Sequence, residues 1–211
     1  MTVSRMKTSG VMVRMERELE FALVERLRAG DVLAFDAVYD YYNPRLLSFL
    51  LRMTKNRAAA EDLLEETWLR LVSGGEELAA DTRLGPWLFT VARNLFLSYC
   101  RSRAREESYI RNLISLWPGE LSRSPHWPYD SACLTEFHDR LEAALAEVPP
   151  KYREVLLLVG FEGLRPADAA AVCGITPEAL RQRLSRARVL LSQRLKDKER
   201  SQEMVSKQVS L

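Results

Sequence analysis

Residues 166–191 decide the fold of this chain, and they read PADAAAVCGITPEALRQRLSRARVLL. The first part, residues 166–172, consists almost wholly of small residues, so a neighbouring helix can approach it closely. Gly174 follows, where a turn with a positive φ costs little. Thr176 is a good N-cap and Pro177 a good first residue for the next helix. A small-residue helix, a glycine turn and a capped helix together predict a helix-turn-helix.

The second helix of this motif carries an outer surface that suits duplex DNA. At about 100° per residue, one stripe is apolar and is expected to be buried; it comprises Leu180, Leu184, Ala187 and Leu191. Short polar groups on the other side reach base edges, and arginines at its rims reach phosphates or guanines. The candidate DNA-binding residues are Thr176, Glu178, Arg181, Gln182, Ser185, Arg186 and Arg188. The alternative is a solvated basic face, but the turn and the small-residue helix before it favour DNA.

Helical periodicity extends over most of the chain and is interrupted once. It runs from about residue 31 to 105 and resumes from about 136 to 195, whereas the region between them contains three prolines and no sustained period. We therefore predict an all-α protein with two small helical domains joined by a flexible linker. The predicted parts are an N-terminal extension (1–24), a helical domain (25–105), the linker (106–135), a helix-turn-helix domain (136–195) and a C-terminal tail (196–211). Ordinary disorder is the expectation for the tail.

Residues 57–72 predict a helix with an acidic outer face. Its inward stripe comprises Ala60, Leu63, Leu64, Thr67 and Leu71. The outer face shows Asp62, Glu65, Glu66 and an outward-pointing Leu69. An acidic face is usually just solvated, but an exposed leucine within it indicates a protein partner.

Residues 86–105 predict a second long helix, whose inward stripe comprises Leu88, Val91, Ala92, Leu95 and Tyr99. The rest of its surface interleaves aromatic rings with arginines and an asparagine, which suits unpaired bases and their phosphates. The candidate residues for single-stranded DNA are Trp87, Arg93, Asn94, Arg101 and Arg103. For Trp87, Phe89 and Leu97, packing on the helix expected at residues 35–53 is the favoured alternative.

Composition narrows the remaining function classes. The formal net charge of +2 argues neither for nor against nucleic acid. Three widely spaced cysteines (Cys100, Cys133 and Cys173) form no zinc or disulfide pattern, and His126 and His138 lack a nucleophile or ligand set. No apolar run approaches the roughly 18 residues of a membrane helix. We expect a soluble, cytoplasmic protein without catalysis, metal, cofactor or membrane insertion.

Four stretches in order resemble one family: AEDLLEETWLRL (60–71), WLFTVARNLFLSYCRSR (87–103), LEAALAEVPPKYREVLLLVGFEGL (141–164) and residues 166–191. Together they resemble small sigma factors of the sigma-70 family, of the extracytoplasmic-function (ECF) type. The resemblance implies a region 2 helical bundle and a region 4 helix-turn-helix. It also implies partners, namely core RNA polymerase, promoter DNA and, as is common for such factors, an anti-sigma factor that the sequence itself does not show.

The resemblance assigns a role to each candidate surface. The acidic helix (Asp62, Glu65, Glu66, Leu69) would bind core polymerase. The helix at 86–105 would capture the unpaired −10 element, and the helix-turn-helix would read the −35 duplex. Glu178–Ala179–Leu180 departs from the usual start of the −35 helix, so the −35 preference cannot be copied from relatives.

Two other functions remain open from the residues. One is a helix-turn-helix regulator that acts without polymerase and binds a palindromic site. The other is a protein-only adaptor or anti-factor whose basic helix is a solvated surface. An enzyme is a more distant alternative, since the sequence offers no catalytic constellation.

Overall fold

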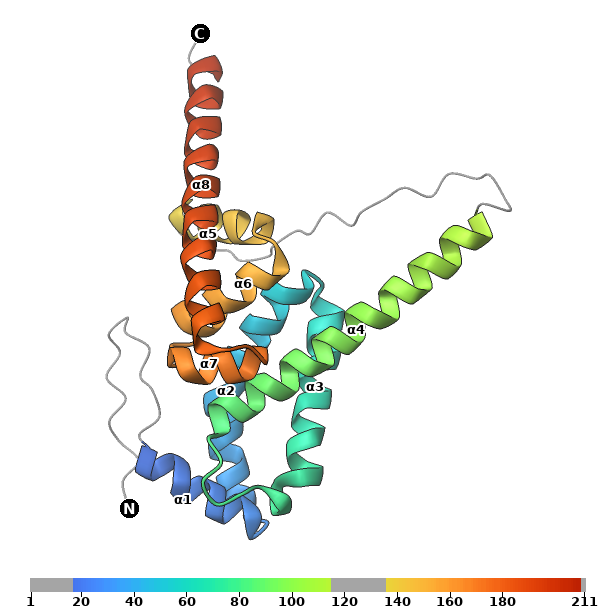
Figure 1. Cartoon of the computed structure of the whole chain (residues 1–211), viewed down its shortest axis with the longest axis vertical. Helices are drawn as coiled ribbons and strands as arrows, with labels where there is room; N and C mark the ends of the chain where they lie inside the picture. The colour runs from blue at the N-terminus through green and yellow to red at the C-terminus, as the bar shows by residue number, and fades with distance from the viewer. Residues whose placement is uncertain (1–16, 115–135, 210–211) are drawn as a thin grey trace.

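The computed structural model describes residues 17–114 and 136–209, which within these ranges form helices and no strand (Figure 1). The elements are α1 (Arg17–Arg28), α2 (Val32–Thr54), α3 (Arg57–Gly74), η1 (Gly75–Glu77), α4 (Leu84–Ile114), α5 (Glu136–Glu147), α6 (Pro150–Leu156), η2 (Leu157–Phe161), α7 (Pro166–Cys173) and α8 (Pro177–Val209). We call α1–α4 the N-terminal module and α5–α8 the C-terminal module. The all-α prediction with two helical domains is confirmed. The predicted linker contains two tryptophans, Trp117 and Trp127, for which docking on another surface is the prediction; both lie outside the described residues.

The N-terminal module is a bundle in which α2, α3 and α4 pack on one another. Asp31 caps α2 by accepting from the backbone N–H of Leu33, and Asn56 caps α3 in the same way from Ala59. Capping of this kind satisfies N–H groups that a helix leaves unpaired at its start. In the core, the rings of Phe49 and Phe89 meet edge to face with centroids 5.5 Å apart. Phe89 therefore packs on α2, as the favoured alternative for this residue expected.

Helix α1 belongs to the bundle, although the sequence placed a domain boundary at residue 24. Its Leu23, Val24 and Leu27 are buried, and the buried carboxylate of Glu20 accepts a hydrogen bond from the backbone N–H of Gly85 (3.2 Å). Burial of these side chains stabilises α1, which packs mainly against α2 and η1. Residues 17–24 are therefore helical and packed, while the limit of the domain at residue 25 stays a prediction.

The C-terminal module contains the predicted helix-turn-helix. Helix α7 runs from Pro166 to Cys173 and is capped by Gly174, whose φ of 64° lies in the left-handed region that glycine adopts freely. The Thr176 hydroxyl then accepts from the backbone N–H of Ala179 (3.2 Å), so it caps α8 as predicted. The small residues of α7 allow α8 to pack closely against it.

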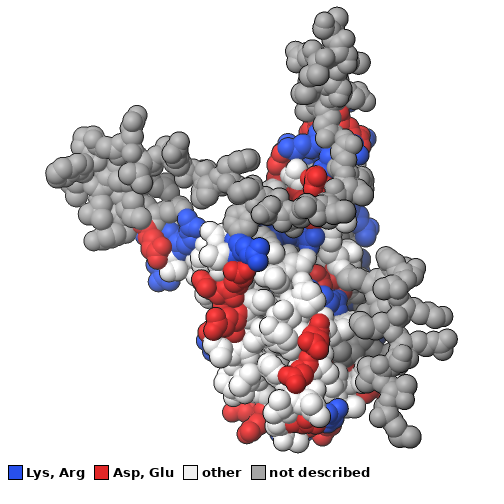
Figure 2. Space-filling model, turned by 180° about the vertical axis from the view of Figure 1, so that it is seen from behind, with Lys and Arg blue, Asp and Glu red and all other residues white. Residues whose placement is uncertain are grey.

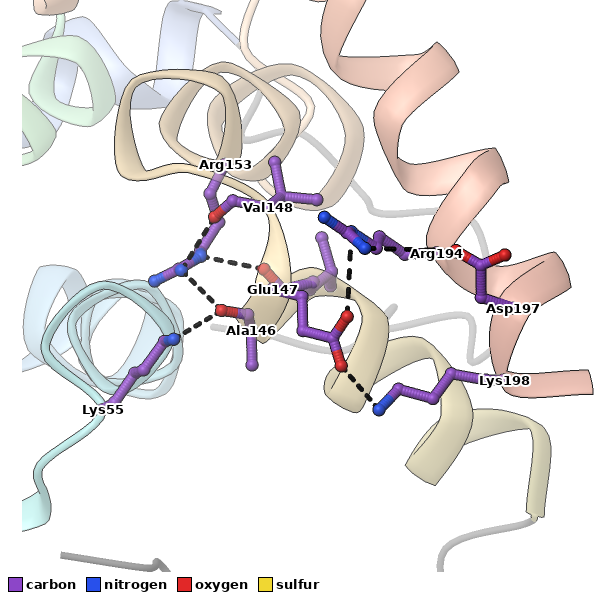
Figure 3. A network of polar contacts seen from close by, with 9 residues as sticks. Lys55, Ala146, Glu147, Val148, Arg153, Arg194, Asp197 and Lys198 are labelled. Atoms are coloured by element: carbon purple, nitrogen blue, oxygen red, sulfur yellow. Dashed lines mark hydrogen bonds and ion pairs between the residues drawn. The ribbon is translucent and has the colours of Figure 1, made fainter. Parts of the chain in front are cut away.

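Two helices are longer than their sequence patterns predicted. Helix α4 continues to Ile114 and α8 to Val209. The first part of the predicted linker and most of the predicted tail are therefore helical. Figure 1 shows α4 projecting from the bundle and α8 rising from the C-terminal module. Close to α8, Glu147 at the end of α5 forms ion pairs with Arg194 (3.7 Å) and Lys198 (2.6 Å), drawn in Figure 3.

Removing residues 192–211 should lower the melting temperature by about 2–4 °C, because exposed ion pairs each contribute little. The hydrogen bond from Lys198, together with Arg194, holds the pKa of Glu147 below its ordinary value of 4.5. The contribution is therefore complete above about pH 4.5 and is lost as the pH falls through the lowered folded-state pKa. Thermal melts at pH 7 and pH 3 test this, with Glu199→Gln in the full chain as the control. Equal melting temperatures for both lengths at pH 7 would contradict it.

Candidate nucleic-acid interface

The first turns of α8 present the predicted duplex-reading residues on one exposed surface. Thr176, Glu178, Arg181, Gln182, Ser185, Arg186 and Arg188 are all exposed. The opposite side is buried at Leu180, Leu184 and Ala187, with Leu191 partly buried. The predicted inner and outer faces of this helix are therefore the observed ones. Arg181 donates to Glu178 at 2.6 Å, with about two-thirds of each side chain exposed, so solvent screens this pair.

Helix α3 exposes the predicted acidic face. Asp62 and Glu65 are exposed, while Glu66 forms an ion pair with Arg70 (2.9 Å). Leu69 is 54% exposed and points outward as expected. An exposed leucine among carboxylates provides apolar contact area within a charged rim, as protein interfaces do.

Further apolar side chains are exposed in the same module, and the sequence reading did not select them. Val72 on α3 is exposed, as are Val32 and Leu33 in the first turn of α2. The Tyr39 ring of α2 is partly exposed, and its centroid lies 4.8 Å from that of the Trp68 ring of α3. This contact links the two helices. The available signal was the pair of apolar residues directly after the N-cap of α2, where a solvated helix usually carries polar groups.

Helix α4 divides the five candidates for single-stranded DNA. Asn94, Arg101 and Arg103 are exposed. Trp87 is half-buried against the core. Arg93 is separated from the others, because its guanidinium forms an ion pair with Glu154 of α6 and only 16% of its side chain is exposed.

Charge is distributed unevenly over the surface. Seen from behind, most basic side chains lie on the upper half of the molecule and on the projecting part of α4, while acidic side chains gather in patches lower down (Figure 2). A basic surface attracts phosphates and an acidic surface repels them. The two halves of this face therefore suit different partners.

Other kinds of site find no support in the described ranges. Within residues 17–114 and 136–209, no three histidine, cysteine or acidic side chains could together hold a metal ion. No helix described here is both long and apolar enough to cross a membrane.

Comparison with known proteins agrees with this geometry. Residues 38–106 match the family model described as Sigma-70 region 2, and residues 138–191 match that described as Sigma-70, region 4. The ECF RNA polymerase sigma factor EcfG of Rhodopseudomonas palustris is 36% identical over 154 residues, covering 71% of this chain and 78% of that protein. The chain belongs to the sigma-70 family, as an ECF sigma factor. A second ECF relative, SigM of Bacillus subtilis, is 33% identical over 165 residues, covering 78% and 94% of the two chains.

A solved structure resembles this sigma factor over most of its length. The sigma factor RpoE of Bartonella quintana, in a complex with the anti-sigma factor NepR, superposes with a TM-score of 0.62 and 29% sequence identity. The similarity covers 77% of this chain and 96% of that one. Helix α1 and the last turns of both α4 and α8 lie outside the matched family regions, and the domain limits 25–105 and 136–195 stay predictions.

Proposed function

We propose that this ECF sigma factor binds core RNA polymerase and directs transcription initiation at its own set of promoters. The observation that carries the proposal is the exposed polar and arginine surface of α8, set on a capped helix-turn-helix within a chain that matches both sigma regions. Core polymerase would bind the acidic face of α3 around Leu69. The protein acts in the cytoplasm as a binding factor rather than as an enzyme.

The two modules divide promoter recognition between them. A capped helix that protrudes from its neighbours fits the major groove of an intact −35 duplex. Asn94, Arg101 and Arg103 on α4, with Arg93 and Trp87, would hold unstacked −10 bases and their phosphates. Because both modules belong to one chain, each weak contact raises the effective concentration for the other.

An anti-sigma factor is a further proposed partner. The RpoE structure similar to this chain was solved in a complex with such a factor. The exposed apolar side chains of α2 and α3, including Leu33 and Leu69, offer a surface that a protein can cover.

Run-off transcription tests the proposed function directly. Purified core RNA polymerase is supplied with a library of promoter fragments, with and without this protein. Initiation that requires both proteins is the expected result, and aligned start sites then give the −35 and −10 preferences. Binding to duplex DNA without any initiation would instead favour a polymerase-independent regulator.

Arg181→Ala or Gln182→Ala should reduce promoter-specific initiation about tenfold, because each removes contacts to one base pair or phosphate. Binding to core polymerase should be unchanged, since both residues lie on α8, away from α3. Arg200→Ala, an exposed arginine further along the same helix, is the matched control. An equal loss of polymerase binding would contradict this assignment to α8.

A further inference from the structure

The two modules are joined by ion pairs that all have the same polarity. Across the described part of the chain, four arginines of the N-terminal module meet four acids of the C-terminal module. The pairs are Arg45–Glu162 (3.0 Å), Arg52–Glu142 (2.6 Å), Arg83–Asp168 and Arg93–Glu154. We call the four acids the interdomain acids.

Further contacts make the arrangement specific at the end of α5. The buried guanidinium of Arg153 donates to the backbone carbonyl of Arg52 (2.9 Å), which belongs to the last turn of α2. The ammonium of Lys55 donates to the carbonyl of Ala146, as Figure 3 shows. Arg52 also lies over the Phe161 ring, 4.8 Å from its centre, in a cation–π contact. These directional bonds fix one register between the modules.

The contact between the modules excludes most water. The side chains of Glu154 and Glu162 are only 7% and 5% exposed. Buried apolar residues of both modules form one continuous cluster, and α7 of the helix-turn-helix packs against α4. A polyanion therefore cannot reach Arg93 while the modules are packed together.

We propose that this packed arrangement is a self-inhibited resting state, in which the interdomain acids occupy arginines of the N-terminal module in place of DNA phosphates. Carboxylates and phosphates bind guanidinium groups through the same charge-assisted hydrogen bonds. Single-stranded DNA and the interdomain acids therefore compete for Arg93, and the modules separate when DNA is captured. The DNA half of this inference rests on the proposed −10 role of Arg93.

The resting state is held weakly enough to open. Burial raises the pKa of Glu154 and Glu162 despite their arginine partners, so pairing does not fully offset the loss of hydration. The second carboxylate oxygen of Asp168 is buried and has no hydrogen-bond partner among the described residues. Incomplete satisfaction of this kind favours a register without contributing much stability.

Inhibition would act on one recognition step only. The duplex-reading residues of α8, such as Arg181 and Arg186, stay exposed in the packed arrangement. Arg93 is covered. The resting protein can therefore meet duplex DNA through α8, whereas full capture of unpaired bases by α4 requires separation of the modules.

The Arg52–Glu142 pair allows the cleanest test, because neither residue belongs to a proposed DNA-binding or polymerase-binding set. Glu142→Arg and Arg52→Glu each place like charges across the contact and should separate the modules. The double charge swap should bring them together again. Glu76→Arg makes the same charge change at an exposed site of η1 and is the matched control.

Two measurements on the full chain test whether the modules separate and whether separation strengthens binding to single-stranded DNA. Small-angle X-ray scattering should give a larger radius of gyration for both single variants at about 150 mM salt, where surface charges are well screened. The swap and Glu76→Arg should match the original chain. Fluorescence anisotropy with a labelled single-stranded oligonucleotide should show at least about tenfold tighter binding for Glu142→Arg, since affinity scales with the open fraction. Glu76→Arg should gain less than about twofold.

The outcomes separate this inference from the proposed function. An unchanged radius of gyration in both single variants would overturn the claim that these ion pairs hold a resting state that can open. An increased radius with no gain in affinity beyond that of Glu76→Arg would overturn inhibition by the interdomain acids. Neither measurement uses polymerase, so failure of run-off transcription would count against the proposed function alone. Circular dichroism confirms that each variant retains its helices.

Discussion

Replacing Arg153 with alanine should lower the free energy of unfolding by about 3–5 kcal/mol, because the change leaves several buried carbonyls without their donor. The Arg153 side chain lies in the interior and donates to the backbone oxygens of Leu145 (2.9 Å), Ala146 (2.8 Å), Val148 (2.8 Å) and Arg52 (2.9 Å). Burial lowers the pKa of this guanidinium from its ordinary value, yet it stays charged at neutral pH.

Urea unfolding followed by circular dichroism measures this loss. The stability of Arg153→Lys should lie between that of the original chain and that of Arg153→Ala, because an ammonium cannot reach all the carbonyls arranged for a planar guanidinium. Arg165→Ala removes an exposed arginine of the same module and should change stability by less than about 0.5 kcal/mol. If Arg153→Ala were as stable as Arg165→Ala, these hydrogen bonds would not hold the α5–α6 turn together.

Leu69→Arg should weaken binding to core RNA polymerase about a hundredfold and abolish initiation at limiting concentrations. The change replaces an exposed apolar contact with a charge, and central interface residues of this kind contribute the largest share of affinity. Stability should hardly change, because 54% of the Leu69 surface is exposed in the free protein. Leu69→Ala should have a smaller effect, of about tenfold, since it removes area without adding charge.

The affinity can be measured by titrating labelled protein with core polymerase in the absence of DNA. Val189→Arg is the matched control, because Val189 is an equally exposed apolar residue on α8. Wild-type affinity for Leu69→Arg, with reduced affinity for Val189→Arg, would move the polymerase contact from the N-terminal to the C-terminal module.

Features with a local cause could be predicted from the sequence. The turn at Gly174, the cap at Thr176 and the buried stripe through Leu180 and Leu184 depend on neighbours within one or two helical turns. The exposed position of Leu69 follows from the same periodicity. For this reason the helix-turn-helix and the outer faces of α3 and α8 were predictable residue by residue.

Features that depend on distant partners could not be predicted in this way. Arg93 has the spacing of a surface residue, and only the packing of α6 against α4 brings Glu154 to it. The end of α8 lacks a strong apolar pattern, and its contact with Glu147 joins residues about fifty positions apart. Helix periodicity reports which side of a helix is buried, but it does not report which other element buries it.

The bond between Arg153 and the carbonyl of Arg52 also affects how cooperatively the chain unfolds. One side chain closes the α5–α6 turn and, with the same guanidinium, holds the last turn of α2. Melting of either module breaks contacts that the other one needs, so in the packed state the two lose their structure in a single transition. Once separated, each module keeps only its own free energy of unfolding, and the less stable of the two melts first.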